Sequence, residues 1–295
     1  MCAGGERNFI EALGITLALI LVVRVFTLIP SAEGLSGAGS FVLIEIFAVV
    51  ILLGGLAVIN LEITGVPGMG RVLKILSTTA AVGLFCIPLI LYFRGSESFS
   101  ISTKAIFESL SEYLNRSVSQ TEGFGLIDRQ QLFQADVLLN FTREIFLRSF
   151  LFEYFLLLSF SWWAGCHFGA RSLGRKAGIT KLIAFKLPDF YIWPLIAGLA
   201  LILLNFVVNL GTIGYLAWNV SLIFLFLYGL AGIGIIKFLF KKYNLPRGVR
   251  FLFITALCIM FLSPGINIAV SVLVPGLGVS EIWIKYRKVE RSREQ

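Results

Sequence analysis

The sequence predicts an all-α polytopic membrane protein with about eight transmembrane helices of ~20 residues each. Of its 295 residues, 57% are hydrophobic and only 14% are charged, whereas soluble proteins carry roughly 25% charged residues. The mean hydropathy of +0.89 is higher than the hydrophobic core of one water-soluble domain requires. An ordinary soluble domain is therefore excluded, and residues 1–295 are interpreted as a single transmembrane domain.

Long apolar runs place the individual spans. They cover residues 9–30, 41–60, 71–93, 145–168, 189–210, 214–240 and 249–284. The last run is interrupted by Ser263-Pro264-Gly265, which is turn chemistry. A straight helix over this run would be about 54 Å long, against a hydrocarbon core of ~30 Å. We therefore expect two antiparallel spans there, with one broken span as the alternative.

The positions of the 25 Lys and Arg residues orient the spans. Most of them fall in segments that an eight-span topology places in the cytoplasm, as the positive-inside rule requires. The N- and C-termini are then both cytoplasmic, whereas seven spans would export the basic tail from Lys285 to Arg293. The net charge of +8 is explained in this way, so no nucleic-acid partner is expected.

One long loop, residues 94–142, is predicted to lie outside the membrane between the third and fourth spans. Its apolar residues recur at helical spacing, and they are Ile106, Phe107, Leu110, Tyr113, Leu114 and Val118. The opposite face carries two acidic and two basic residues, which favours a cap on the protein over a lipid-binding helix. A second amphipathic run, 126–141, leads into the fourth span.

No catalytic or metal-binding constellation is found in the sequence. Gly34-Leu35-Ser36-Gly37 has the form found around the serine of rhomboid-type proteases, but the single histidine, His167, is predicted at the opposite membrane surface. His167 and Cys166 supply at most two of the ligands that zinc needs. We therefore expect no enzyme activity, no metal and no cofactor. The cysteines have no paired spacing and are expected to be free thiols.

Ionisable residues at membrane depth are the functional candidates, because charge is costly there. Arg24 and Glu45 lie at matching depths in the first two spans, so an ion pair between them is one interpretation, and extension of Arg24 to the outer surface is another. In the fourth span, Glu144 and Arg148 have the i, i+4 spacing of a helix ion pair. Glu153 has no such partner and must contact another helix, line a wet cavity or stay protonated.

Polar amides are predicted in the same outer half of the membrane. They are Asn205 and Asn209 in the fifth span, Asn219 in the sixth and Asn267 after the Pro264 turn. With the ionisable residues they suggest a polar vestibule that opens outward; the alternative is that amides simply collect near lipid headgroups. The small residues from Gly229 to Gly234 are interpreted as close helix packing.

The last third of the chain resembles the YybS-like family of predicted bacterial membrane proteins, over about residues 187–288. The matching motifs are Lys186-Leu187-Pro188, Trp193-Pro194, the Leu-x-Gly-rich sixth span, Leu277-Gly278-Val279-Ser280-Glu281 and Tyr286-Arg287-Lys288. The chain departs from that family at two positions. It has Ala231 where the family tends to carry Gln, and the family's acidic pair near the end appears here as Glu281 and Lys285. The resemblance implies a multi-pass protein of the bacterial cytoplasmic membrane and supplies no catalytic residue.

Two functions fit these observations. The first is a small-solute-binding or transport-type protein whose outward vestibule is lined by Glu153, Arg148, Arg24, Glu45, Asn205 and Asn219. The alternative is a non-catalytic scaffold or assembly factor, whose basic cytoplasmic loops contact a protein partner or anionic lipid. The expected partners are thus the lipid bilayer, a small solute and a cytoplasmic or membrane protein.

Overall fold

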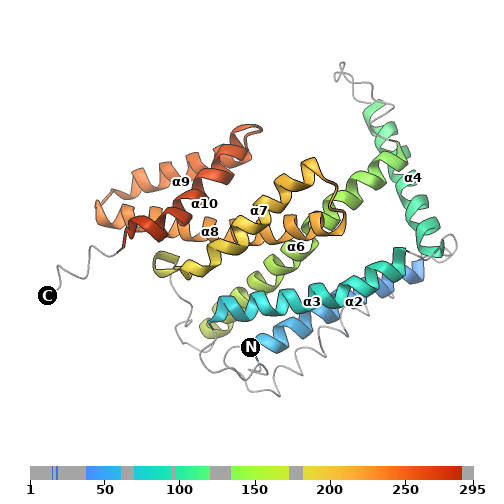
Figure 1. Ribbon diagram of the computed structural model, residues 1–295, viewed down its shortest axis with the longest axis horizontal. Coiled ribbons are helices and arrows are strands. Elements are labelled where there is room, and N and C mark those ends of the chain that lie inside the picture. Colours follow the sequence, from blue (N-terminus) through green and yellow to red (C-terminus); the bar gives the residue numbers. More distant parts are fainter. Residues whose placement is uncertain are drawn as a thin grey trace. The chain divides into compact units, whose positions relative to one another are not determined.

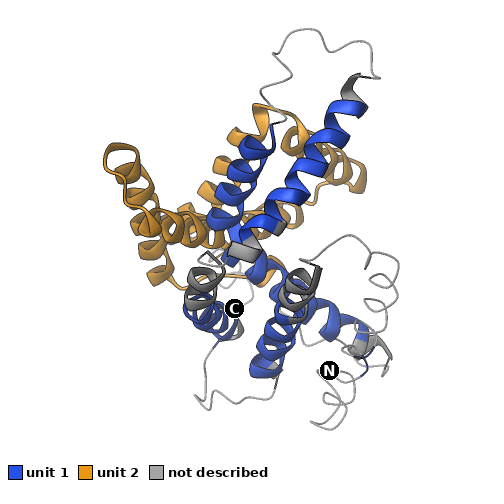
Figure 2. Ribbon diagram, turned by 90° about the vertical axis from the view of Figure 1, so that its right-hand side faces the viewer, with its two compact units in different colours: residues 1–177 blue, residues 178–295 orange. Residues whose placement is uncertain are grey.

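The computed structural model describes residues 15, 18, 38–60, 70–94, 97–119, 134–172 and 182–287. Within these ranges the chain forms eight α-helices and two short 3-10 helices, with no β-strand (Figure 1). The predicted all-α class is confirmed for this part of the chain. The chain forms two compact units, residues 1–177 and 178–295, which are coloured separately in Figure 2. The predicted span 9–30 lies outside the described residues, except for the helical Ile15 and Ala18.

Three long helices form the packed part of the first unit. They are α2 (Ala38–Asn60), α3 (Arg71–Arg94) and α6 (Ala135–Ser172). The helices α2 and α3 lie side by side and both contact α6 (Figure 1). Glycines allow this approach: a Cβ at Gly55 would collide with the Tyr154 hydroxyl, and one at Gly83 would lie 2.9 Å from the Leu151 side chain. Leu151, Phe155 and Leu158 of α6 are consequently buried.

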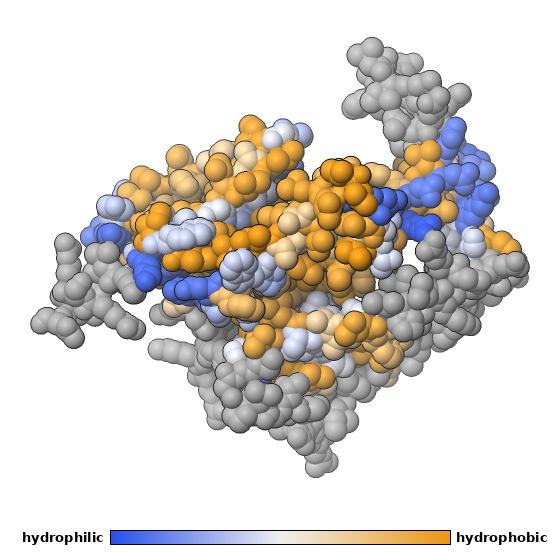
Figure 3. Space-filling model, viewed as in Figure 1, coloured by the Kyte–Doolittle hydropathy of each residue, from blue (hydrophilic) through white to orange (hydrophobic). Residues whose placement is uncertain are grey.

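The predicted amphipathic helix of the outer loop is present as α4 (Glu97–Ser119). It packs on α6, and Lys104 Nζ lies 3.9 Å from Asp136 Oδ1 in the first turn of that helix. Figure 3 shows a hydrophilic surface over α4 and a largely hydrophobic one over α7 and α9. With 38 residues, α6 is about 57 Å long and extends beyond a ~30 Å hydrocarbon core.

The second unit is built around its longest helix, α8. The elements are η2 (Leu182–Ala184), η3 (Asp189–Tyr191), α7 (Ile192–Val207), α8 (Thr212–Lys242), α9 (Arg247–Leu262) and α10 (Ile266–Ile284). The central helix α8 contacts α7 on one side and α10 on another. Leu227, Tyr228 and Ile235 of α8 are almost fully buried. The predicted break of the last apolar run is confirmed, because α9 ends at Leu262 and Gly265 turns the chain with φ +86°.

The helices α8 and α10 cross at glycines. A Cβ at Gly232 would collide with the carbonyl oxygen of Val274, and a Cβ at Gly278 would collide with that of Tyr228. At Gly234 it would collide with the carbonyl oxygen of Leu182. The prediction that these small residues permit close helix packing is therefore confirmed.

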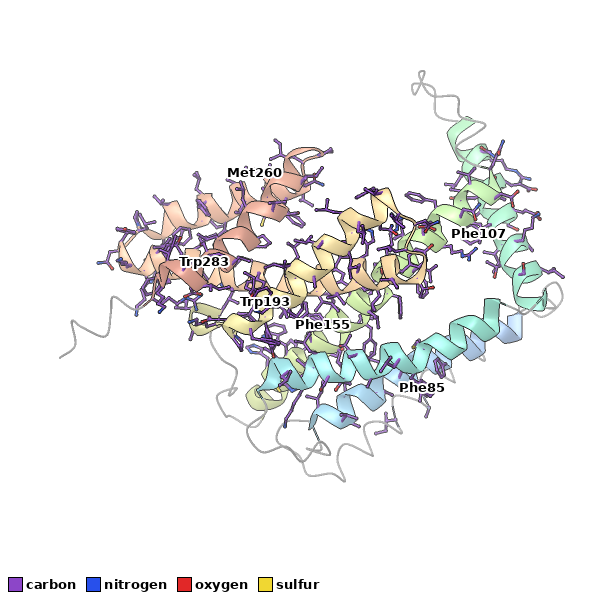
Figure 4. The ribbon with its side chains drawn as sticks, in the orientation of Figure 1. Phe85, Phe107, Phe155, Trp193, Met260 and Trp283 are labelled. Atoms are coloured by element: carbon purple, nitrogen blue, oxygen red, sulfur yellow. The ribbon has the colours of Figure 1, made fainter. Side chains whose placement is uncertain are left out.

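Four helical segments of the described chain are long and apolar enough to cross a membrane. They are Ala135–Phe168, Asp189–Val207, Thr212–Lys242 and Ile266–Ile284. In the second unit, Trp193 at the start of α7 and Trp283 near the end of α10 are both exposed (Figure 4). Such residues are typical of membrane–water interfaces. Cys86 and Cys258 are free as expected, whereas Cys166 is disulfide-bonded, which corrects the expectation of free thiols.

Candidate functional site

The ionisable residues of α6 that the sequence singled out, Glu144, Arg148 and Glu153, form two separate groups. Near the N-terminal end, Arg148 Nη2 lies 2.8 Å from Glu144 Oε2, and both side chains are nearly half-exposed. This i, i+4 ion pair confirms the prediction from their spacing. Each charge therefore has a local counter-ion, which lowers the cost of holding the pair in or near a membrane.

Glu153 lies one turn further along α6, and its carboxyl group has a partner on its own helix. Ser149 Oγ is 2.6 Å from Glu153 Oε1 and 2.8 Å from the carbonyl oxygen of Ile145. The sequence left three alternatives for Glu153, which were a contact with another helix, a wet cavity or protonation, and Ser149 was not included as a partner. The expectation was incomplete, since a hydroxyl group at i−4 reaches a glutamate carboxyl.

Glu153 faces away from the helices that pack on α6. The packed face is marked by Leu151, Leu158 and Tyr154, whose hydroxyl donates to the carbonyl oxygen of Ile51 at 3.3 Å. At 100° per residue, Glu153 lies roughly 150° from the middle of that face. Its side chain is exposed. The buried Phe155, labelled in Figure 4, belongs to the packed face.

Besides Ser149, the outward face of α6 around Glu153 carries apolar residues. Phe146 and Phe150 stack with ring centroids 5.9 Å apart. Leu157 and Phe160 follow on the next turns and are more than half-exposed. A carboxyl group in the middle of a candidate span is thus surrounded by side chains suited to lipid or to another helix.

Two of the four predicted amides, Asn205 and Asn219, were also predicted as site residues, and they have different surroundings in the second unit. Asn205 Oδ1 accepts a hydrogen bond from the backbone N–H of Leu210 at 2.9 Å and lies against Gly214, so it holds the α7–α8 turn. Asn219 is fully buried within α8, and its Nδ2 donates to the carbonyl oxygen of Tyr215 at 2.9 Å. Asn205 therefore stabilises the α7–α8 turn, whereas Asn219 makes its contact within α8.

Of the six residues predicted to form a site, the structure places four. Arg148 and Glu153 share α6 but lie on different faces, and Asn205 and Asn219 belong to the other unit. Arg24 lies outside the described residues, and Glu45 is described only as backbone within α2. The vestibule therefore stays a prediction. Within the described residues, no three His, Cys, Asp or Glu side chains are grouped to hold a metal ion.

A buried ion pair at the end of α10 was not predicted. Arg287 Nε lies 3.0 Å from Glu281 Oε1, and the two side chains are 16% and 6% exposed. Arg287 also donates to the carbonyl oxygens of Phe185 at 2.8 Å and Ala231 at 3.2 Å. One guanidinium group therefore joins α10, α8 and the segment that leads into α7.

A family model described as a predicted membrane protein family, DUF2232, matches residues 69–274, which is more than half of the chain. The chain belongs to this family. The match includes α3, α4, α6, α7, α8 and α9 and supports a membrane location for the protein. No curated protein and no solved structure matches the chain.

In a membrane protein, the carboxyl groups of Glu281 and Glu153 are suited to different roles. Glu281 is neutralised by Arg287 inside the second unit, so it serves packing. Glu153 lies on an exposed face of α6 and is hydrogen-bonded to a neutral hydroxyl group, so its carboxyl group is accessible to a polar or cationic group. Among the described residues, Glu153 is therefore the strongest candidate for a functional side chain.

Proposed function

We propose that the protein is a multi-pass protein of the bacterial cytoplasmic membrane that binds or transports a small solute. In this proposal eight helices span the membrane, both termini are cytoplasmic, and α4 with the first turns of α6 lies outside. Three observations support it: the membrane family, the distribution of Lys and Arg along the chain, and the turn between α9 and α10. This turn allows the last apolar run to form two spans.

One observation carries the solute-binding proposal: Glu153 stands midway along the candidate span Ala135–Phe168 on an apolar face. A carboxylate at the centre of a transmembrane helix costs about 2.5–3.5 kcal/mol on insertion scales. Packing gives no reason for it, because α2 and α3 occupy the opposite face. A role in recognising a polar or cationic solute group would explain an acid at this depth.

Native mass spectrometry of the gently solubilised full-length protein tests this proposal. We expect a small molecule to co-purify with the wild type and to be lost in Glu153→Gln. The matched control is Glu108→Gln, the same change at an exposed position on α4, which should retain the molecule. Equal retention in wild type and Glu153→Gln, or an empty wild type, would contradict a solute site at Glu153.

A scaffold or assembly factor is the second candidate, and the connection between α8 and α9 favours it. Lys241, Lys242 and Arg247 are all exposed there, close together in the chain. Such a basic cluster suits an acidic protein segment or anionic lipid. A stoichiometric protein partner without a small molecule in the same mass spectra would favour this candidate, provided that neutralising the three cations releases the partner.

A further inference from the structure

The apolar residues of α4 are divided between two faces of the helix. Phe107 and Leu114 are half-buried on the side that packs on α6. Ile106, Leu110 and Tyr113 are exposed. At 100° per residue, these three lie within about 60° of one another and roughly 90° from the packed side. Packing on α6 therefore accounts for only part of the apolar pattern of this helix, and Ile106, Leu110 and Tyr113 form an exposed stripe.

The acidic residues of α4 lie away from the exposed stripe. Glu108 and Glu112 lie roughly 150° from its middle, and Glu112 Oε2 is 3.4 Å from Arg116 Nη2. Three acidic and two basic side chains nearly balance along the helix. The helix is thus amphipathic, and its small net charge gives it little attraction to anionic lipid headgroups.

The place of α4 in the fold sets the level of the stripe. The helix α3 ends at Arg94 and α4 begins at Glu97, so α4 starts where a predicted span ends. Figure 1 shows α4 running across the end of α3 rather than continuing in its direction. The family match supports a membrane location for the protein, and it includes both helices. A helix that runs across the end of a membrane-spanning α3 lies along the membrane surface.

The first turns of α6 expose further apolar side chains at this level. Lys104 Nζ of α4 lies 3.9 Å from Asp136 Oδ1 of α6. Val137, Phe141 and Ile145 follow along α6 and are all exposed. Exposed apolar residues that gather in one region indicate contact with a membrane or a protein. The exposed stripe of α4 is therefore part of a wider apolar region at the end of the predicted spans.

We propose that α4 is an interfacial helix whose exposed stripe lies among the lipid headgroups and the first carbons of the acyl chains. Helices of this kind bury their apolar face ~5–10 Å into that boundary. Tyr113 suits this depth, because a tyrosine has an apolar ring and a polar end. The sequence favoured a cap on the protein over a lipid-binding helix; in this proposal α4 is both, because one side covers α6 and the next contacts lipid.

The apolar stripe carries the proposed contact, so the contact should form on lipid without net charge. The proposal requires the protein to lie in a membrane, but it does not require a bound solute. Its occupant is the lipid bilayer. A second copy of the chain or another segment of the same chain are the competing occupants.

Spin labels on the full-length protein in phosphatidylcholine liposomes test the proposal. Leu110→Cys and Tyr113→Cys each place a label on the exposed stripe. Glu108→Cys and Glu112→Cys are matched controls on the polar side of the same helix, and both replaced residues are exposed. Electron paramagnetic resonance then measures how often each label collides with oxygen, which concentrates in lipid, and with a water-soluble nickel chelate.

The background is a parent protein in which the free thiols of Cys86 and Cys258 are removed by replacement with Ala. The spectrum of the labelled parent, which has no added cysteine, is subtracted from each measurement. Thermal unfolding of each variant beside the parent shows whether the fold is retained. If either stripe variant fails to fold, Ile106→Cys repeats the measurement on the same face.

We expect the ratio of oxygen to nickel collisions to be severalfold higher at positions 110 and 113 than at positions 108 and 112. Equal, low ratios at all four positions would mean that the stripe faces water, and they would overturn the proposal. Few collisions with either probe at 110 and 113 would mean that protein covers the stripe, which would also overturn it. Loss or retention of a solute at Glu153 does not change these ratios, so the lipid contact and the solute site are tested separately.

Discussion

Two glutamates in α6 and α10 illustrate opposite ways to place an acid in an apolar helix. Glu281 of α10 is almost fully buried, and a guanidinium group neutralises it. Glu153 of α6 is exposed on an apolar face, and its partner is a hydroxyl group of the same helix. The comparison teaches that burial with a counter-ion indicates a structural acid, whereas an exposed acid in a candidate span has no packing role. The same isosteric change should therefore have different effects at the two positions.

Glu281→Gln should produce the largest loss of stability. The change leaves Arg287 buried beside a neutral amide, and breaking a buried ion pair in this way costs about 3–5 kcal/mol. Thermal unfolding in detergent should show a clear drop in the midpoint temperature. Lys285→Gln is the control, because Lys285 is exposed and its loss should change little. A midpoint equal to that of the wild type would mean that the pair is not needed for packing.

Replacing both partners sharpens this result. In the double variant Glu281→Leu with Arg287→Met, no buried charge is left uncompensated, and such apolar replacements are often neutral. We expect the double variant to be more stable than Glu281→Gln. If it is less stable, the two hydrogen bonds from Arg287 to Phe185 and Ala231 contribute more than the ion pair.

Gly278→Ala should have the next largest effect. Its Cβ would collide with the carbonyl oxygen of Tyr228 in α8, so α8 and α10 must separate, and overpacking of this kind costs about 1–3 kcal/mol. Gly276→Ala is a matched control in the same helix, because nothing lies within 4 Å of its added Cβ. Equal unfolding midpoints for the two variants would show that the helices do not cross at Gly278 in solution.

The helical segments were largely predictable from the sequence, because each follows from a local pattern. The apolar run 41–60 is α2 (Ala38–Asn60), and the amphipathic spacing of 106–118 lies within α4. The break at Pro264 followed from turn chemistry, and the close helix packing of α8 followed from the small residues after Gly229, although α10 was not predicted as the partner. Each of these signals acts within a few residues of the chain, so periodicity and composition reveal it.

The contacts of the candidate site were harder to predict. Arg287 meets Glu281 because α10 ends at Ile284 and Lys285 turns the chain in the left-handed region with φ +31°. Helical spacing cannot reveal a pair formed across such a turn. Arg287 also binds the carbonyl oxygen of Phe185, about one hundred residues away in sequence. For Glu153, the signal was present at Ser149, but an i−4 hydroxyl was not considered as a partner.

Asn205→Ala should have a moderate effect, confined to the second unit. The change leaves the backbone N–H of Leu210 without its side-chain acceptor, and a hydrogen bond of this type contributes about 0.5–1.5 kcal/mol. Hydrogen exchange should show faster exchange at Leu210 and Gly211 in the α7–α8 turn, with α2 and α3 unchanged. If exchange in the turn is unchanged and solute retention is lost instead, Asn205 belongs to a binding site, as the sequence predicted.

Glu153→Gln should have the smallest effect on stability, within about 0.5 kcal/mol of wild type, as for exposed substitutions in general. The amide keeps the shape of the carboxyl group, and its oxygen can still accept the hydrogen bond that Ser149 Oγ donates, so this contact is retained. Thermal unfolding of Glu153→Gln beside Glu281→Gln measures the same chemical change on an exposed and a buried acid. A large destabilisation at Glu153 would mean that its carboxyl group holds a structural contact, which would contradict the difference between the two glutamates. A stable Glu153→Gln protein that has lost a bound molecule would instead assign the acid to function, because the packing of the described residues does not require it.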